Sequence, residues 1–217
     1  PTQEGEDVFQ QKFPKKQTKE DNLQIKELWD LLHCSNDSKF KTTIANHFNI
    51  HNIIDWHLLL LLTNNGDGVT KNFYWYKKNN GLWNVVPWDY DDSFGRNGDG
   101  TLQTHLNHCN WQRNILLKRL FNLNVDNYRL KLKHKWNSIR NNGLNLAKVQ
   151  ELINTYYTEL KPKDLENNFN KWPINDANYS DSLNYKEELE LIYDYIPKKI
   201  KEIDSLTTLW ETQLITY

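Results

Sequence analysis

Residues 58–95 read LLLLLTNNGDGVTKNFYWYKKNNGLWNVVPWDYDDSFG, and this stretch decides the fold. It begins inside IIDWHLLLLL (53–62), a run that is apolar on most sides and therefore predicts a buried helix. The turn formers TNNGDG end that helix. Two aromatic and β-branched runs follow, 72–78 and 82–87, and the NNG between them predicts a β-hairpin.

The hairpin leads directly into an acidic segment, WDYDDSFG at 88–95. Acidic residues normally face water, whereas Trp88 and Phe94 are residues that a core accepts. We therefore expect both aromatic side chains to pin the segment to the core, with Asp92 facing solvent.

The remainder of the chain is predicted to be helical. Thr18 begins a helix whose leucines share one face, and Asp37 or Ser38 caps a short helix through Phe40 and Phe48. VFQQKF (8–13) predicts a short strand. Further helices are expected at about 111–122, 125–140, 144–160, 162–170 and 184–213. The expected fold class is mainly α with a small central β-hairpin (α+β).

The net charge, the apolar runs and the cysteine count of the chain argue against several classes of function. The 217 residues carry a formal charge of −1, so no overall basic field attracts nucleic acid or an anionic membrane. The longest apolar run, 56–62, is too short to span a bilayer. Cys34 and Cys109 are predicted to be buried free thiols, because two cysteines form no disulfide framework. The chain starts at Pro1 and has no Met, so we expect it to be a piece of a longer protein.

The polar loop before the hairpin contains Asp67 and, five positions later, Asn72. This is the spacing of the catalytic loop of protein kinases, where the Asp orients the substrate hydroxyl and the Asn binds a metal. Asp89 stands where the second strand ends, with Phe94 and Gly95 close behind. Phosphoryl transfer requires hard oxygen ligands for Mg²⁺ and a carboxylate near the attacking oxygen. A hairpin holds such groups together because its two ends are adjacent.

The stretch from LLLLL to WDYDDSFGR resembles the signature of the CotH kinase family, the spore coat protein H-like atypical kinases. The resemblance implies that Asp67 is the catalytic acid, and that Lys71 neutralises developing phosphate charge. It implies that Asn72 and Asp89 bind the metal and nucleotide, with Asp91 as a supplementary metal ligand. Gly66 departs from the family pattern, in which many members have Trp.

The resemblance also implies a division of the chain. No Gly-rich loop and no strand with a phosphate-pairing Lys precede residue 20, so the chain is similar to a kinase C-terminal lobe only. Residues 1–18 are expected to be a lobe-boundary strand or linker, and 19–217 the lobe. Within the lobe, the expected parts are a catalytic loop (64–72), the hairpin (72–87), a metal loop (88–95) and a helical tail (111–213).

The implied function is transfer of the γ-phosphate of ATP to Ser or other hydroxyls of protein substrates, with Mg²⁺ or Mn²⁺. The implied location is the spore coat, the cell envelope or the outside of the cell. Alone, the lobe is expected to be an inefficient kinase. The sequence does not indicate the oligomeric state.

Other interpretations stay open at this point. A carbohydrate-active enzyme would use Asp67 and Asp89 as paired carboxylates with tryptophans as sugar platforms. A non-catalytic binding or surface module would keep the fold without turnover, and NNGDG is a natural turn sequence in any case. His105, His108 and Cys109 lack the second Cys/His pair that a zinc finger needs. Trp136, Trp172 and Trp210 are expected to pack in the helical tail.

Overall fold

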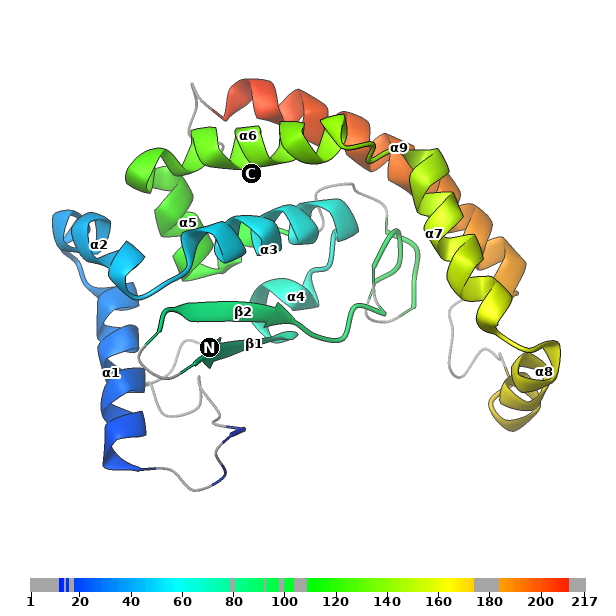
Figure 1. Ribbon diagram of the computed structural model, residues 1–217, viewed down its shortest axis with the longest axis horizontal. Coiled ribbons are helices and arrows are strands. Elements are labelled where there is room, and N and C mark those ends of the chain that lie inside the picture. The colour runs from blue at the N-terminus through cyan, green and yellow to red at the C-terminus, as the bar shows by residue number, and fades with distance from the viewer. Residues whose placement is uncertain are drawn as a thin grey trace.

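The computed structural model describes residues 12, 13, 15, 18–78, 81–91, 93–97, 100–103, 109–173 and 184–210. This part of the chain is mainly helical with one two-stranded antiparallel sheet, as the sequence predicts (Figure 1). The α-helices and strands are α1 (Lys19–His33), α2 (Asp37–Thr43), α3 (Ile50–Thr63), α4 (Asp67–Thr70), β1 (Phe73–Lys77), β2 (Trp83–Pro87), α5 (Ile115–Asn122), α6 (Tyr128–Asn141), α7 (Leu146–Glu159), α8 (Pro162–Lys171) and α9 (Tyr185–Leu209). Short 3-10 turns lie at Ile44–Asn46, Trp111–Arg113 and Val125–Asn127.

Helix α3 is the centre of the core. It lies between the hairpin and α6, and it also contacts α9 (Figure 1). Ile53, Trp56 and Leu60 are among its eight buried residues, so the prediction of a buried helix is confirmed. Because α3 is apolar on most sides, it can be covered by the sheet on one side and by helices on the other.

The predicted hairpin is confirmed, with Phe73 opposite Pro87 and Lys77 opposite Trp83. The outer edge of β2 is closed by the backbone just before α3, where the Trp83 amide donates to the His47 carbonyl over 2.7 Å, and by the Asn52 side chain at the start of α3. Asn52 Oδ1 accepts from the Val85 amide over 2.6 Å, and Asn52 Nδ2 donates to the Val85 carbonyl over 3.1 Å. An exposed strand edge invites pairing with other chains, so this arrangement satisfies the backbone without a third strand.

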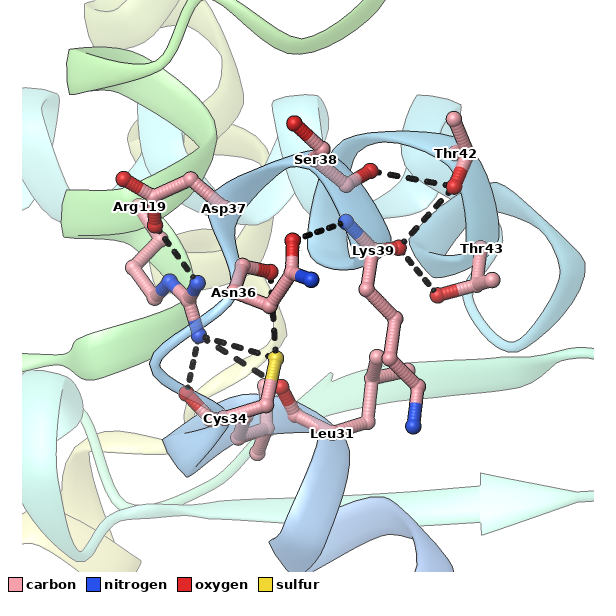
Figure 2. Close-up of polar contacts among 10 residues, drawn as sticks. Leu31, Cys34, Asn36, Asp37, Ser38, Lys39, Thr42, Thr43 and Arg119 are labelled. Carbon is pink, nitrogen blue, oxygen red and sulfur yellow. Dashed lines mark hydrogen bonds and ion pairs between the residues drawn. The ribbon is translucent and has the colours of Figure 1, made fainter.

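The N-terminal helices pack at the other end of the hairpin from the acidic segment (Figure 1). Thr18 begins α1 with a capping box, as predicted. The cap of α2 is Asn36 and not Asp37 or Ser38, because the Asn36 side chain accepts the Lys39 amide over 2.9 Å. Figure 2 shows Arg119 of α5 reaching into this corner between the two helices.

The predicted tail helices are present, with α9 ending at Leu209 and residues 211–213 outside the described part. Helix α7 packs along α9 and leads to α8 (Figure 1). Trp136 and Trp210 are buried as expected, but Trp172 is not. Trp172 is 60% exposed, and the Lys171 ammonium lies 4.4 Å from its ring centroid. This contact explains how an indole is kept at the surface without a core partner.

Two further expectations concern thiols and the N-terminal strand. Cys34 and Cys109 are both free, as predicted; Cys109 is buried, but Cys34 is only half-buried. Most of VFQQKF lies outside the described residues, and its last two positions, Lys12 and Phe13, are not in a strand. In the described part of the chain, no helix has the length and apolar character needed to cross a membrane.

Candidate functional site

The polar loop and the acidic segment meet at one end of the hairpin. Asn72 directly precedes β1 and Trp88 directly follows β2. The Trp88 amide donates to the Asn72 carbonyl over 3.1 Å, which extends the ladder by one bond beyond the Phe73–Pro87 pair. The segments that carry the predicted site residues are therefore adjacent in space.

Asp67 lies on α4, a single helical turn where the sequence predicts only a loop. Its carboxylate is half-buried, and Lys71 Nζ lies 2.9 Å from Asp67 Oδ2. One turn separates the two residues, so the i,i+4 spacing brings the ammonium to the carboxylate. The predicted catalytic acid, Asp67, therefore forms an ion pair with Lys71.

The turn is compact because of Gly68. A Cβ at this position would lie 2.9 Å from the Tyr90 hydroxyl and 3.0 Å from Leu60 Cδ2. The backbone of the polar loop therefore approaches both the acidic segment and α3 more closely than any side chain would allow. Gly66, which departs from the family pattern, begins the turn without a side-chain cap.

Asn72 joins the two predicted acids through their backbones. Its amide N–H donates to the Asp67 carbonyl over 3.0 Å, and its side-chain Nδ2 donates to the Asp89 carbonyl over 3.1 Å. Because Nδ2 is engaged by the Asp89 carbonyl, Oδ1 is the remaining polar atom of the amide group and can act as an acceptor. Among the predicted site residues, Asp67, Lys71, Asn72 and Asp89 are therefore brought together.

The acidic segment has an unusual backbone. Asp89 has φ +59° and Phe94 has φ +53°, both in the left-handed region. Such conformations persist where the surroundings determine them, and they concentrate at functional sites. Asp89 and Asp91 are exposed, whereas Ser93 is buried, and the Phe94 amide donates to the Thr63 carbonyl over 2.9 Å. Asp92 lies outside the described residues.

Phe94 and Trp88, the two aromatic residues expected to pin the segment, differ in burial. Phe94 packs against the core and meets Tyr195 edge to face, as expected. The expectation for Trp88 is wrong, since it is 57% exposed. Side chains alternate between the two faces of a strand, so Trp88 follows Val86 onto the outer face, where its ring lies 5.5 Å from that of Tyr74. An exposed aromatic pair therefore stands beside Asp89.

Tyr90 lies beneath the site. Its hydroxyl and the Trp56 indole N–H are buried, and neither has a hydrogen-bond partner of normal geometry in the described part of the chain. Burial raises the pKa of the Tyr90 phenol to about 12, although the nearby Trp56 side chain opposes this shift. Tyr90 is therefore neutral at physiological pH and serves as packing against Gly68.

Sequence reasoning missed one residue that connects the two loops. Asn65 is fully buried, and its Oδ1 accepts from the Gly68 amide over 2.6 Å. Its Nδ2 donates to Ser93 Oγ over 3.3 Å and lies 3.5 Å from the Asp89 carbonyl. An Asn inside TNNGDG looks like an ordinary turn residue, so the sequence carries no signal for this role.

The candidate site carries oxygen donors from carboxylate and amide side chains. In the described residues, no group of three His, Cys, Asp or Glu side chains is placed to hold a metal ion. Mg²⁺ usually keeps several waters and takes one or two carboxylates together with substrate phosphates. Asp89, Asp91 and the Asn72 amide carry hard oxygen donors of the type that Mg²⁺ and Mn²⁺ take.

Only Cys109 of the possible zinc cluster lies in the described part of the chain. His105 and His108 lie outside the described residues, and Cys109 is buried beside the aliphatic and aromatic core. Burial raises the pKa of the Cys109 thiol to about 11, although the positive charge of Lys199 opposes this shift.

Comparison with known proteins points to one family. A family model described as CotH kinase protein matches residues 2–203. The chain is also similar to inner spore coat protein H of Bacillus subtilis (strain 168), with 29% identity over 84 residues. That match covers 38% of this chain and 23% of the relative, so the matched segment spans less than a quarter of the relative's length.

Proposed function

The chain belongs to the CotH kinase protein family, and on that premise we propose that it contributes the metal-binding half of a phosphotransferase site. The proposed reaction moves the γ-phosphate of ATP to Ser or other hydroxyls of a protein substrate. The observation that carries the proposal is the position of Asn72, which donates to the backbone carbonyls of both Asp67 and Asp89. A phosphotransferase requires an acid near the attacking hydroxyl and oxygen donors near the metal, held at a fixed spacing.

Each predicted residue has a role in this scheme. Asp67 accepts a hydrogen bond from the substrate hydroxyl and orients it toward the phosphate. Lys71, 2.9 Å from Asp67, places positive charge where negative charge accumulates on the transferred group. Asn72, Asp89 and Asp91 would hold Mg²⁺ or Mn²⁺, which neutralises phosphate charge when bound.

The exposed aromatic pair supports the nucleotide part of the proposal. Trp88 directly precedes Asp89, and its indole meets Tyr74 on the outer face of the hairpin. Base–aromatic stacking contributes about 1–3 kcal/mol per base. A nucleotide base on Trp88 would place its phosphates near Asp89.

Two alternatives receive less support. In a non-catalytic module we would expect a pocket closed by Trp88 or Phe94, with Asp89 paired to a Lys. No such ion pair joins two described residues, and Trp88 is exposed. The Trp88–Tyr74 pair is also a surface on which a sugar could stack, so release of reducing sugar from a polysaccharide is the matching control assay. Family membership favours phosphotransfer over that reaction.

Association with the spore coat is part of the proposal. The relative is described as an inner spore coat protein. We propose that this chain acts on hydroxyl-rich proteins in a comparable assembly.

The test is transfer of labelled phosphate from ATP to a Ser-rich acceptor with Mn²⁺, using the longest native form of the protein. Binding of Mn²⁺ with ATP to the 217-residue chain is measured in parallel. Asp67→Ala is expected to abolish transfer and retain Mn²⁺ binding, whereas Asp89→Ala is expected to abolish both. Asp30→Ala, at an exposed residue on α1, is the control. Full transfer by both site variants would refute the assignment.

A further inference from the structure

Asn65 is a fully buried side chain that contacts both halves of the site. It lies two residues after the end of α3 at Thr63 and two residues before Asp67. Its exposed fraction is 0%. A buried amide with unmet hydrogen bonds is costly, so its orientation is set by its partners.

The partners of Asn65 leave one orientation of the amide. Oδ1 accepts the Gly68 N–H of the α4 turn over 2.6 Å, whereas Nδ2 faces two acceptors, Ser93 Oγ at 3.3 Å and the Asp89 carbonyl at 3.5 Å. A flipped amide would set Nδ2 against the Gly68 N–H and leave the acceptors without a donor. One side chain thus links the loop of Asp67 to the segment of Asp89.

The Asp89 backbone needs such a link. Its φ of +59° is one that most residues avoid, and Asp tolerates it at some cost. The Asp89 carbonyl faces two amide groups, that of Asn72 at 3.1 Å and that of Asn65 at 3.5 Å. These donors come from the two ends of the Asp67 loop, so the carbonyl is linked to both ends.

We infer that Asn65 is a positioning residue, which fixes the spacing between Asp67 and the metal-binding Asp89 by holding the α4 turn and the Ser93 segment together. The inference rests on the proposed function. Residues behind metal ligands commonly change metal affinity by about 10–100-fold when they are replaced. Asn65 acts in this way through Asp89 and touches neither metal nor substrate.

The neighbouring residue provides a matched comparison. Asn64 is also fully buried and also uses both ends of its amide. Its Oδ1 accepts the Cys109 amide over 2.9 Å, and its Nδ2 donates to Gln103 Oε1 over 2.7 Å. These partners lie in the segment after the acidic residues, so Asn64 matches Asn65 in burial and chemistry but contacts a different part of the chain.

The experiment compares Asn65→Asp with Asn64→Asp in the 217-residue chain. Each change keeps the acceptor, replaces the Nδ2 donor with an oxygen and introduces one buried carboxyl group. Mn²⁺ is titrated in the presence of a non-hydrolysable ATP analogue, and amide hydrogen exchange is measured without metal. Asn65→Asp is expected to raise the half-saturating Mn²⁺ concentration about tenfold and to speed exchange in the peptide covering 88–95. Asn64→Asp is expected to lower the melting temperature similarly and to leave both readouts unchanged.

Several results would overturn the inference. Equal shifts in the two variants, or no shift in Asn65→Asp, would show that Asn65 has only a structural role. If Asn65→Asp does not fold, Ser93→Ala removes one acceptor of the same amide. A smaller shift in the same direction is then expected, and wild-type values would refute the inference. A wild-type chain that binds Mn²⁺ and nucleotide but transfers no phosphate would refute the proposed function alone, whereas a chain that binds no Mn²⁺ would refute both.

Discussion

The side-chain amide of Asn72 donates a hydrogen bond to the backbone carbonyl of Asp89 over 3.1 Å. This bond gives Asn72 two separable roles, because Nδ2 holds the acidic segment and Oδ1 is the proposed metal ligand. Asn72→Ala is expected to weaken binding of Mn²⁺ with nucleotide by at least about tenfold, since both roles are lost. Asn72→Asp retains an oxygen ligand and loses the donor. We expect it to keep most of the Mn²⁺ affinity while hydrogen exchange in 88–95 speeds up. Equal Mn²⁺ affinities in the two variants would contradict the proposed metal contact.

Gly68 and Tyr90 are in contact, and replacing the glycine tests that contact. The added methyl of Gly68→Ala would stand 2.9 Å from the Tyr90 hydroxyl and 3.2 Å from Asn65 Cγ. Overpacking of this kind costs about 1–3 kcal/mol of unfolding free energy. Tyr90→Phe removes a buried hydroxyl without a partner among the described residues, so it should cost little by itself. The double variant is expected to recover part of the loss, as measured by urea denaturation. Additive single effects would mean that the two positions do not touch.

The hairpin and the helices around it were predictable because their signals are local. The NNG turn and the apolar run 53–62 need no knowledge of distant residues. The position of Trp88 was not predictable in this way. Its size suggested burial, but its register places it on the outer face with Tyr74 and Val86, a face that no described helix or strand covers. The role of Asn65 depends on Ser93 and Asp89, which lie more than twenty residues away. A single sequence carries no signal for such a pairing.

His57 makes the stability of the core depend on pH. It is fully buried, its Nδ1 lies 3.1 Å from the Tyr128 hydroxyl, and burial lowers its pKa from 6.5 to about 3. Between pH 6.5 and about pH 3, His57 therefore binds a proton in the unfolded chain but not in the folded chain. Stability is complete above about pH 6.5 and falls as the pH drops toward 3, by up to about 1.4 kcal/mol per pH unit.

The measurement is the free energy of unfolding between pH 7 and pH 4 for wild type and His57→Gln. The difference between the two curves should shrink as the pH falls, because only the wild type loses stability through this group. His134→Gln, at an exposed histidine on α6, is the control and should run parallel to wild type. A His57→Gln curve parallel to wild type would show that the buried imidazole titrates normally.

The two thiols are expected to differ in reactivity. Cys109 is 2% exposed and burial raises the pKa of its thiol to about 11, whereas Cys34 is half-buried beside Arg119. A thiol reagent at pH 8 should therefore modify one cysteine of the folded chain quickly and the second only in denaturant. Cys34→Ser should remove the fast phase. Rapid reaction of both thiols in the folded chain would contradict the burial of Cys109.

Arg119 joins α5 to the corner between α1 and α2 through three kinds of contact (Figure 2). Its Nη1 donates to the Leu32 carbonyl over 2.8 Å, its Nη2 donates to Asp37 Oδ1 over 2.8 Å, and its guanidinium lies 4.0 Å from the Phe40 ring centroid. A lysine has one point charge and no planar fork, so it cannot make all three contacts at once. Arg119→Lys is expected to lower the free energy of unfolding by about 1–3 kcal/mol in urea denaturation.

The control for this change is Arg113→Lys, at an exposed arginine, which should alter stability by less than about 0.5 kcal/mol. Asp37→Asn separates the ion pair from the other contacts. The Asp37 side chain is 60% exposed, and a pair this open to solvent contributes about 1 kcal/mol or less. The Asp37 variant should therefore lose clearly less stability than Arg119→Lys. If the two variants lose the same amount, the ion pair is the dominant contact, and the carbonyl and ring contacts of Arg119 add little to the corner.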